Sequence, residues 1–217
     1  MSGHSNAEVL ESDTVDMLLP VATDPLKRGL DIVVAGLLLI FFAPMLLIIA
    51  ALIKLESPGP ALFRQKRGGL NGRTFTIYKL RSMRVEENGD KVVQAQRKDS
   101  RITFIGKIVR ASSVDELPQL LNVLKGDMSL VGPRPHAQAH DDYYSALIPT
   151  YHLRFQARPG LTGLAQIRGF RGGTNDVEDM ANRIRSDIDY IDNWSLVSDI
   201  RIMLMTVPHL LIAENAY

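Results

Sequence analysis

The sequence predicts an α+β protein that is mainly helical, with an N-terminal re-entrant membrane hairpin and a membrane-associated globular domain containing a small β-hairpin. Three features indicate this class: a long uncharged apolar run, two short strand-like segments around an Asn-Gly pair, and helical periodicity in the second half. The 25 Lys and Arg residues nearly balance the 24 Asp and Glu residues, which disfavours a nucleic-acid partner. The lack of cysteine excludes disulfides and thiolate metal sites.

The N-terminal segment differs in composition from the rest. Residues 1–24 are polar and acidic, with Glu8, Glu11, Asp13 and Asp16 and no sustained apolar period, so we expect a flexible tail. Residues 25–217 are long enough for one domain with its own core.

Residues 32–53 form a run of 22 residues without a charge, fifteen of them Leu, Ile, Val or Phe. As one helix the run would extend about 33 Å, long enough to cross a bilayer, which makes a buried helix of a soluble protein or a signal peptide the weaker interpretations. Basic residues flank both ends, and Pro44 lies almost at the midpoint. Because positive flanks favour the cytoplasm and proline kinks a helix, we expect two half-helices folded back at Pro44, over about residues 30–55. A spanning helix with a tolerated proline is the alternative.

Residues 61–67 and 74–81 have strand-like composition and are separated by a Gly-rich segment with Asn71 and Gly72, which predicts a β-hairpin. Residues 64–110 carry thirteen Lys and Arg against four Asp and Glu. This basic zone could bind phosphate groups or anionic lipid, and the number of charges alone favours lipid.

Residues 112–119 precede a helical pattern of leucines and contain Asp115 and Glu116. Ser113 and Glu116 have the spacing of a capping box, an ordinary structural explanation that does not involve Asp115. Two adjacent carboxylates at the positive end of a helix could instead share a divalent cation, and such a carboxylate can act as a base or a nucleophile.

Two proline-containing segments each present an arginine. Arg134 lies between Pro133 and Pro135 after Gly132, and the stiff backbone makes it a candidate phosphate clamp, although an arginine in an ordinary turn is equally consistent. Arg158 precedes a Pro-Gly turn in the same way. Farther on, residues 177–191 have helical periodicity, and residues 196–213 are apolar enough to lie on a bilayer as an amphipathic helix.

From about Pro25 to its C-terminus the chain resembles the bacterial sugar transferases, the monotopic polyprenyl-phosphate hexose-1-phosphate transferases. The segments that carry the resemblance are Ser-Pro-Gly-Pro at 57–60, Gln65 with Arg67, Tyr-Lys-Leu-Arg-Ser-Met at 78–83, Asp-Ser-Arg-Ile-Thr at 99–103, Asp-Glu-Leu-Pro-Gln at 115–119, Gly-Asp-Met-Ser at 126–129, Gly-Pro-Arg-Pro at 132–135 and Arg-Pro-Gly-Leu-Thr-Gly at 158–163.

The resemblance implies transfer of a hexose-1-phosphate from a UDP-sugar to undecaprenyl phosphate with release of UMP, as in exopolysaccharide synthesis. UDP-glucose and UDP-galactose are the expected donors. The resemblance further implies that Asp115 is the nucleophile of a covalent phosphosugar intermediate and that Glu116 assists, with both near Mg²⁺. It also implies a position on the cytoplasmic face of the bacterial inner membrane. The expected phosphate contacts are Lys79, Arg81, Arg134 and Arg158. The alternative from another class is a membrane-anchored scaffold or lipid-binding protein, which explains the basic zone but gives no role to Asp115.

Overall fold

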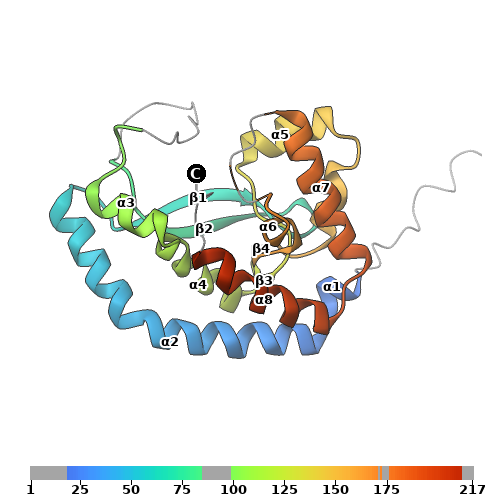
Figure 1. The fold of residues 1–217 in the computed structure, drawn as a ribbon, viewed down its shortest axis with the longest axis horizontal. Coiled ribbons are helices and arrows are strands. Elements are labelled where there is room, and N and C mark those ends of the chain that lie inside the picture. Colours follow the sequence, from blue (N-terminus) through green and yellow to red (C-terminus); the bar gives the residue numbers. More distant parts are fainter. Residues whose placement is uncertain (1–18, 85–98, 171, 173–175, 212–217) are drawn as a thin grey trace, which may run out of the picture.

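The computed structural model describes residues 19–84, 99–170, 172 and 176–211, and it is mainly helical with two small sheets (Figure 1). Its helices are α1 (Pro20–Thr23), α2 (Pro25–Glu56), α3 (Phe104–Ala111), α4 (Leu120–Lys125), α5 (Gln138–Leu147), α6 (Leu164–Ile167), α7 (Val177–Asp192) and α8 (Leu196–Leu211), with 3₁₀ turns η1 (Leu70–Gly72), η2 (Val114–Gln119) and η3 (Tyr151–Gln156). Most of the predicted tail, residues 1–18, lies outside the described part of the chain. Residues 20–23, which we assigned to the tail, form α1 with Val21 and Ala22 buried, so the ordered domain begins before residue 25.

Helix α2 contains the apolar run and is the one described helix that is long and apolar enough to cross a membrane. Asp24 caps it by accepting a hydrogen bond from the Lys27 backbone N–H at 2.9 Å, and Pro25 occupies the first turn, where proline is tolerated. The helix continues through Pro44 and bends, so that it curves around one side of the molecule (Figure 1). It is therefore one bent helix, and not two half-helices folded against each other.

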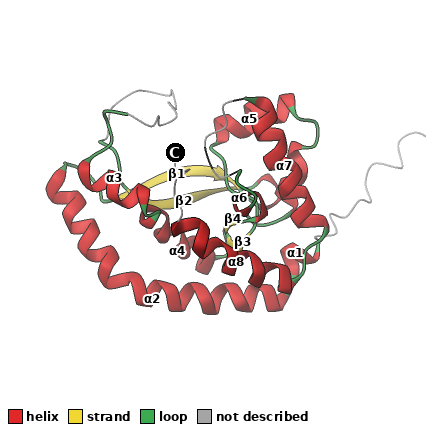
Figure 2. Ribbon diagram, viewed as in Figure 1, coloured by secondary structure: helices red, strands yellow, loops and turns green. Residues whose placement is uncertain are grey.

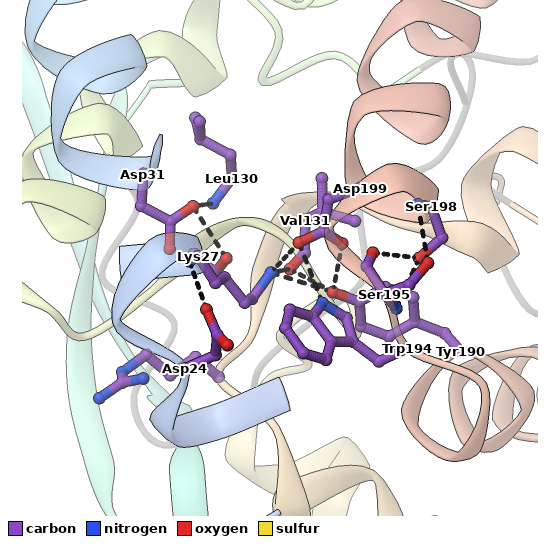
Figure 3. A network of polar contacts seen from close by, with 12 residues as sticks. Asp24, Lys27, Asp31, Leu130, Val131, Tyr190, Trp194, Ser195, Ser198 and Asp199 are labelled. Carbon is purple, nitrogen blue, oxygen red and sulfur yellow. Dashed lines mark hydrogen bonds and ion pairs between the residues drawn. The ribbon is translucent and has the colours of Figure 1, made fainter. Parts of the chain in front are cut away.

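The N-terminal end of α2 is fixed to the globular domain by buried polar contacts (Figure 3). The Lys27 ammonium donates to the Asp199 carboxylate of α8 at 2.6 Å, to the Tyr190 hydroxyl of α7 at 3.0 Å and to the Val131 carbonyl at 3.1 Å. Asp31, one turn later, accepts from the Leu130 N–H at 2.9 Å. Charged groups this deeply buried require such partners, which makes the position of this helix end specific.

The C-terminal end of α2 contacts the same domain. The Arg81 guanidinium donates to the carbonyls of Ile53 at 3.2 Å and Ser57 at 2.7 Å, which are acceptors at the end of the helix. Glu56 accepts from the Phe104 N–H at 2.6 Å, at the first turn of α3. Both ends of the apolar helix are thus attached to one globular body.

The β-hairpin is confirmed. Strands β1 (Leu62–Gly68) and β2 (Thr74–Leu80) pair antiparallel from Leu62 opposite Leu80 to Gly68 opposite Thr74. Asn71 and Gly72 adopt φ values of 53° and 71°, the left-handed region that these residue types tolerate. Figure 2 shows the hairpin among the surrounding helices.

A second sheet, which the sequence did not predict, pairs β3 (Ser129–Val131) parallel with β4 (Gly160–Thr162). The Gly132 N–H donates to the Thr162 carbonyl at 2.9 Å and the Gly160 N–H donates to the Pro133 carbonyl at 2.9 Å. A Cβ atom on Gly160 would lie 2.1 Å from the Gly132 nitrogen, so the two backbones require glycine to approach this closely. The pairing holds the segment that leads to Arg134.

The core lies between the first half of α2, helices α4, α7 and α8, and strand β3. Its buried members are Val21, Ala35, Ile77, Leu120, Val123, Met128, Leu130, Val131, Ala157, Tyr190, Ile191 and Ile202. Helix α8 follows the predicted amphipathic segment: Ile202 and Asp199 face inward, while Val197, Leu204 and Val207 are exposed. Exposed apolar side chains on α2 and α8 are consistent with membrane association.

Candidate active site

The two adjacent carboxylates lie on the turn η2, between α3 and α4. Ser113 enters this turn with a φ of 57°, and its side chain does not cap the turn. The Glu116 side chain points to other partners, so the capping-box interpretation is wrong. Helix α4 begins at Leu120, after the turn, so the expectation that the carboxylates occupy the first turn of an α-helix is wrong as well.

Glu116 is the centre of a charged cluster assembled from three parts of the chain. Lys79, from β2, donates to Glu116 Oε1 at 2.7 Å. Arg134, from the loop after β3, donates to both oxygens of Glu116, at 3.1 Å to Oε2 and 2.6 Å to Oε1. Burial opposes ionisation of Glu116, but the Arg134 guanidinium and the Lys79 ammonium outweigh it and hold the pKa of Glu116 well below its usual range.

Asp115 experiences the opposite balance. Burial and, secondly, the neighbouring Glu116 carboxylate raise the pKa of Asp115 to about 6, against the weaker attraction of Lys79, Arg110 and Arg134. Asp115 is still ionised at neutral pH, but it is a much stronger base than an ordinary aspartate. The hydrogen bonds from Lys79 and Arg134 go to Glu116, so the two adjacent carboxylates differ in their partners and in the direction of their pKa shifts.

The structure does not bring the other two predicted arginines into this cluster. Arg81 is buried and donates to the carbonyls of Ile53, Ser57 and Pro58. Arg158 donates to the carbonyls of Gly126 and Ala22. Both guanidiniums therefore stabilise helix ends by pairing with backbone carbonyls: Arg81 at the end of α2, and Arg158 at the ends of α4 and α1.

Two further arginines, Arg67 and Arg154, lie close to Arg134 and are absent from the predicted site. Burial and the nearby Arg134 guanidinium lower the pKa of Arg67 to about 10. Arg154 donates to the Arg134 carbonyl and to Asp187 at 3.0 Å, which fixes the backbone of the Arg134 loop. Gln65 and Arg67 stand together among the segments that carry the family resemblance, and this could have indicated Arg67 as a site residue. In the structure the Arg67 guanidinium donates to Gln65 Oε1 at 2.6 Å.

A metal ion would find a partial site here. Within the described ranges, no group of three or more His, Cys, Asp and Glu side chains could hold a metal. Asp115 and Glu116 nevertheless offer carboxylate oxygens of the kind Mg²⁺ accepts, and Mg²⁺ usually takes one or two carboxylates together with substrate phosphates and water. The pair therefore fits Mg²⁺ that is bound jointly with a diphosphate.

A partly buried acidic pair, two cations and a long apolar helix are the parts expected of a phosphoryl-transfer site at a membrane. The chain belongs to the bacterial sugar transferase family, whose model matches residues 22–213. It is 66% identical over 197 residues to a UDP-glucose:undecaprenyl-phosphate glucose-1-phosphate transferase of Caulobacter vibrioides, covering 91% of this chain and 74% of the relative.

Two further relatives show how the family varies. A protein of Escherichia coli with the same name is 48% identical over 192 residues, covering 88% of this chain and 41% of the relative. A UDP-N-acetylgalactosamine-undecaprenyl-phosphate N-acetylgalactosaminephosphotransferase of Aeromonas hydrophila is 41% identical over 217 residues, covering all of this chain and 51% of the relative. This chain therefore spans about half or less of the length of these two relatives, and the family contains members named for different sugars.

Proposed function

We propose that this protein transfers glucose-1-phosphate from UDP-glucose to undecaprenyl phosphate and releases UMP. The observation that carries the proposal is the difference between two adjacent carboxylates: Glu116 is paired with Lys79 and Arg134, whereas Asp115 has a raised pKa. Relatives of the chain are named for this reaction. UDP-N-acetylgalactosamine is the second candidate donor, because the Aeromonas relative is named for it. UDP-galactose, which the sequence also suggested, remains in the test.

Asp115 is the proposed nucleophile. Its ionised oxygen attacks the β-phosphorus of the UDP-sugar, a new P–O bond forms, and the bond to the bridging oxygen breaks so that UMP leaves with the electron pair. An oxygen of undecaprenyl phosphate then attacks the same phosphorus, and Asp115 departs as a carboxylate. A carboxylate with a pKa of about 6 suits this role, since it is ionised at neutral pH yet more basic than usual.

Glu116, Lys79 and Arg134 support the transfer by charge. The two cations lie 2.6–2.7 Å from one Glu116 oxygen, and either can turn to a phosphate oxygen when the diphosphate arrives. Mg²⁺, held by Asp115 and Glu116 with the phosphates, would neutralise part of the charge of the diphosphate.

We further propose that α2 enters and leaves the membrane on one side, the cytoplasmic face of the inner membrane. Both ends of α2 bond to the same globular domain, through Lys27 at one end and through Glu56 and Arg81 at the other. A straight helix across the bilayer would place these ends on opposite sides. Single cysteines at positions 20 and 90 should therefore be labelled from the same side, and labelling from opposite sides would establish a spanning helix.

The function is tested by UMP release from purified full-length protein with Mg²⁺, undecaprenyl phosphate and each of UDP-glucose, UDP-galactose and the UDP-N-acetylhexosamines. We expect release with UDP-glucose, dependence on lipid and metal, and loss in Asp115→Asn. The control is Asp142→Asn, which changes an exposed aspartate on α5. Absence of release with every donor would favour the membrane-anchored scaffold. Undiminished release in Asp115→Asn would instead mean that Asp115 is not the nucleophile.

A further inference from the structure

A cavity of about 350 Å³ lies between α2, α8 and the turn that carries the acidic pair. Val34 and Leu38 of α2 line one wall, and Met203, Leu204 and Val207 of α8 line another. Ser113 and Glu116 lie at its border, so the cavity reaches the candidate active site. The volume falls in the range of ligand sites, about 300–1,000 Å³.

The surroundings of the cavity are those of a membrane-facing site. Leu37 and Ile40 follow along α2 with exposed fractions of 64% and 75%, and Leu204, on the cavity wall, is 69% exposed. Of the polar wall groups, the Thr162 and Thr206 hydroxyls bond to each other at 2.7 Å, whereas Gln166 Oε1 is buried without a hydrogen-bond partner in the described part of the chain. Most of the wall is aliphatic, so the space is suited to a hydrocarbon group that can enter from the apolar surface of α2 and α8.

The charge at the border of the cavity indicates how such a ligand is oriented. Glu116 is held by Lys79 and Arg134, two cations that can receive an anionic headgroup. The UDP-sugar does not match the walls, because its base, sugars and phosphates offer no extended apolar surface. A ligand with an anionic phosphate at one end and a hydrocarbon chain at the other matches both parts.

We propose that this cavity binds the first isoprene units of the polyprenyl phosphate acceptor, with the phosphate toward Glu116 and the remaining chain in the bilayer. The inference rests on the proposed function, which supplies the acceptor, and adds where its chain lies. An acyl chain of an ordinary phospholipid could fill the same space, but its headgroup would then occupy the place that the acceptor phosphate needs for reaction.

The test uses a matched pair of variants on adjacent residues of α2. Val34→Phe adds bulk inside the cavity, whereas Val33→Phe adds the same bulk on the outer face, where Val33 is 59% exposed. We expect Val34→Phe to raise the KM for undecaprenyl phosphate about tenfold or more and to leave the KM for the UDP-sugar unchanged. Val33→Phe should change neither by more than about twofold. Leu161→Phe, which fills the cavity from β4, should reproduce Val34→Phe.

A second readout does not depend on turnover. An undecaprenyl phosphate analogue with a photoreactive group in its first isoprene units should label α2 and α8 in the parent protein and label Val34→Phe much less. Undecaprenyl phosphate should compete with this labelling, and phosphatidylglycerol vesicles should not. Labelling without UMP release for any donor would contradict the proposed function and support the cavity assignment. Unchanged labelling and acceptor KM in both cavity variants would overturn the assignment, as would equal competition by phosphatidylglycerol.

Discussion

Replacing Asp115 with Asn should stabilise the folded protein while it abolishes transfer. Asn keeps the shape of a protonated aspartate and removes the negative charge. In the native structure that charge is disfavoured by burial and by Glu116, which together raise the pKa of Asp115 to about 6. The folded protein therefore carries an energetic cost at this position that Asn removes, as expected where a reactive group is held in an unfavourable environment.

The magnitude follows from the change in pKa on folding. The ordinary aspartate value is 3.8, so the shift to about 6 amounts to about 3 kcal/mol at about 1.4 kcal/mol per pH unit. Between these two pH values the native state binds more protons than the unfolded state, so the stability of the parent falls as pH rises toward 6. The advantage of Asp115→Asn is thus near zero below pH 4 and complete above about pH 6.

Thermal unfolding in detergent, followed from pH 4 to pH 8 with EDTA present, measures this difference. For a chain of 217 residues, about 3 kcal/mol corresponds to a rise in Tm of about 6–12 °C at pH 7. Asp142→Asn, at an exposed site, should leave Tm within about 2 °C of the parent at every pH.

The pH dependence makes the reasoning refutable. A Tm for Asp115→Asn equal to or below that of the parent at pH 7 would mean that Asp115 is not held in an unfavourable ionised state. A rise of equal size at pH 4 and pH 7 would mean that the gain comes from packing or hydrogen bonding, and not from charge.

Four further predictions concern the pH dependence of turnover and three other charged residues, Glu116, Lys27 and Arg67. Glu116→Gln should lower stability by about 2–4 kcal/mol, because Lys79 and Arg134 lose their partner, and an unchanged Tm would contradict this. Turnover of the parent should fall about tenfold per pH unit below about pH 6, as the nucleophile is protonated, and a rate independent of pH down to 5 would exclude this titration. Lys27→Met should lower the unfolding free energy by about 3–5 kcal/mol, because it leaves the buried Asp199 carboxylate of α8 without its cation. In a double-mutant cycle, Lys27→Met combined with Asp199→Asn should cost less than the sum of the two single changes, and a cost equal to that sum would contradict the pairing. Arg67→Gln should raise the KM for the UDP-sugar, because the Arg67 charge lies close enough to Arg134 to add to the positive field that attracts a diphosphate. The exposed Arg64→Gln on the same strand should not raise it, and equal effects of the two changes would contradict a role for Arg67 in donor binding.

The sequence predicted the elements that are determined by residues close together in the chain. The hairpin follows from Asn71 and Gly72 between two strand-like segments, and the long helix follows from its uncharged apolar run. Lys79, Arg134 and the acidic pair, which the resemblance places in one site, lie together in the structure, and phosphate binding there stays a prediction. In these cases residue type and spacing within a few positions determine the outcome.

The features that the sequence did not predict depend on contacts between distant segments. The sheet of β3 and β4 joins two three-residue strands about thirty positions apart, and it depends on the close approach of Gly132 and Gly160. Arg81 and Arg158 resemble phosphate ligands in sequence, but they bond to carbonyls at helix ends. An arginine beside a basic strand, such as Arg81, or before a Pro-Gly turn, such as Arg158, has the same sequence signature in both roles, and only the tertiary structure separates them.

The pKa values of the acidic pair also depend on contacts between distant segments, so the sequence did not predict them either. Asp115 and Glu116 are adjacent, yet their pKa values move in opposite directions because Lys79 and Arg134 both donate to Glu116. Both donors come from outside the turn, one from β2 and one from the loop that the β3–β4 pairing holds in place. Val131, at the end of β3, accepts from Lys27 in the first turn of α2. The pKa of Asp115 therefore depends on the same framework that attaches α2 to the domain, so we expect a substitution at Lys27 to alter this pKa through β3.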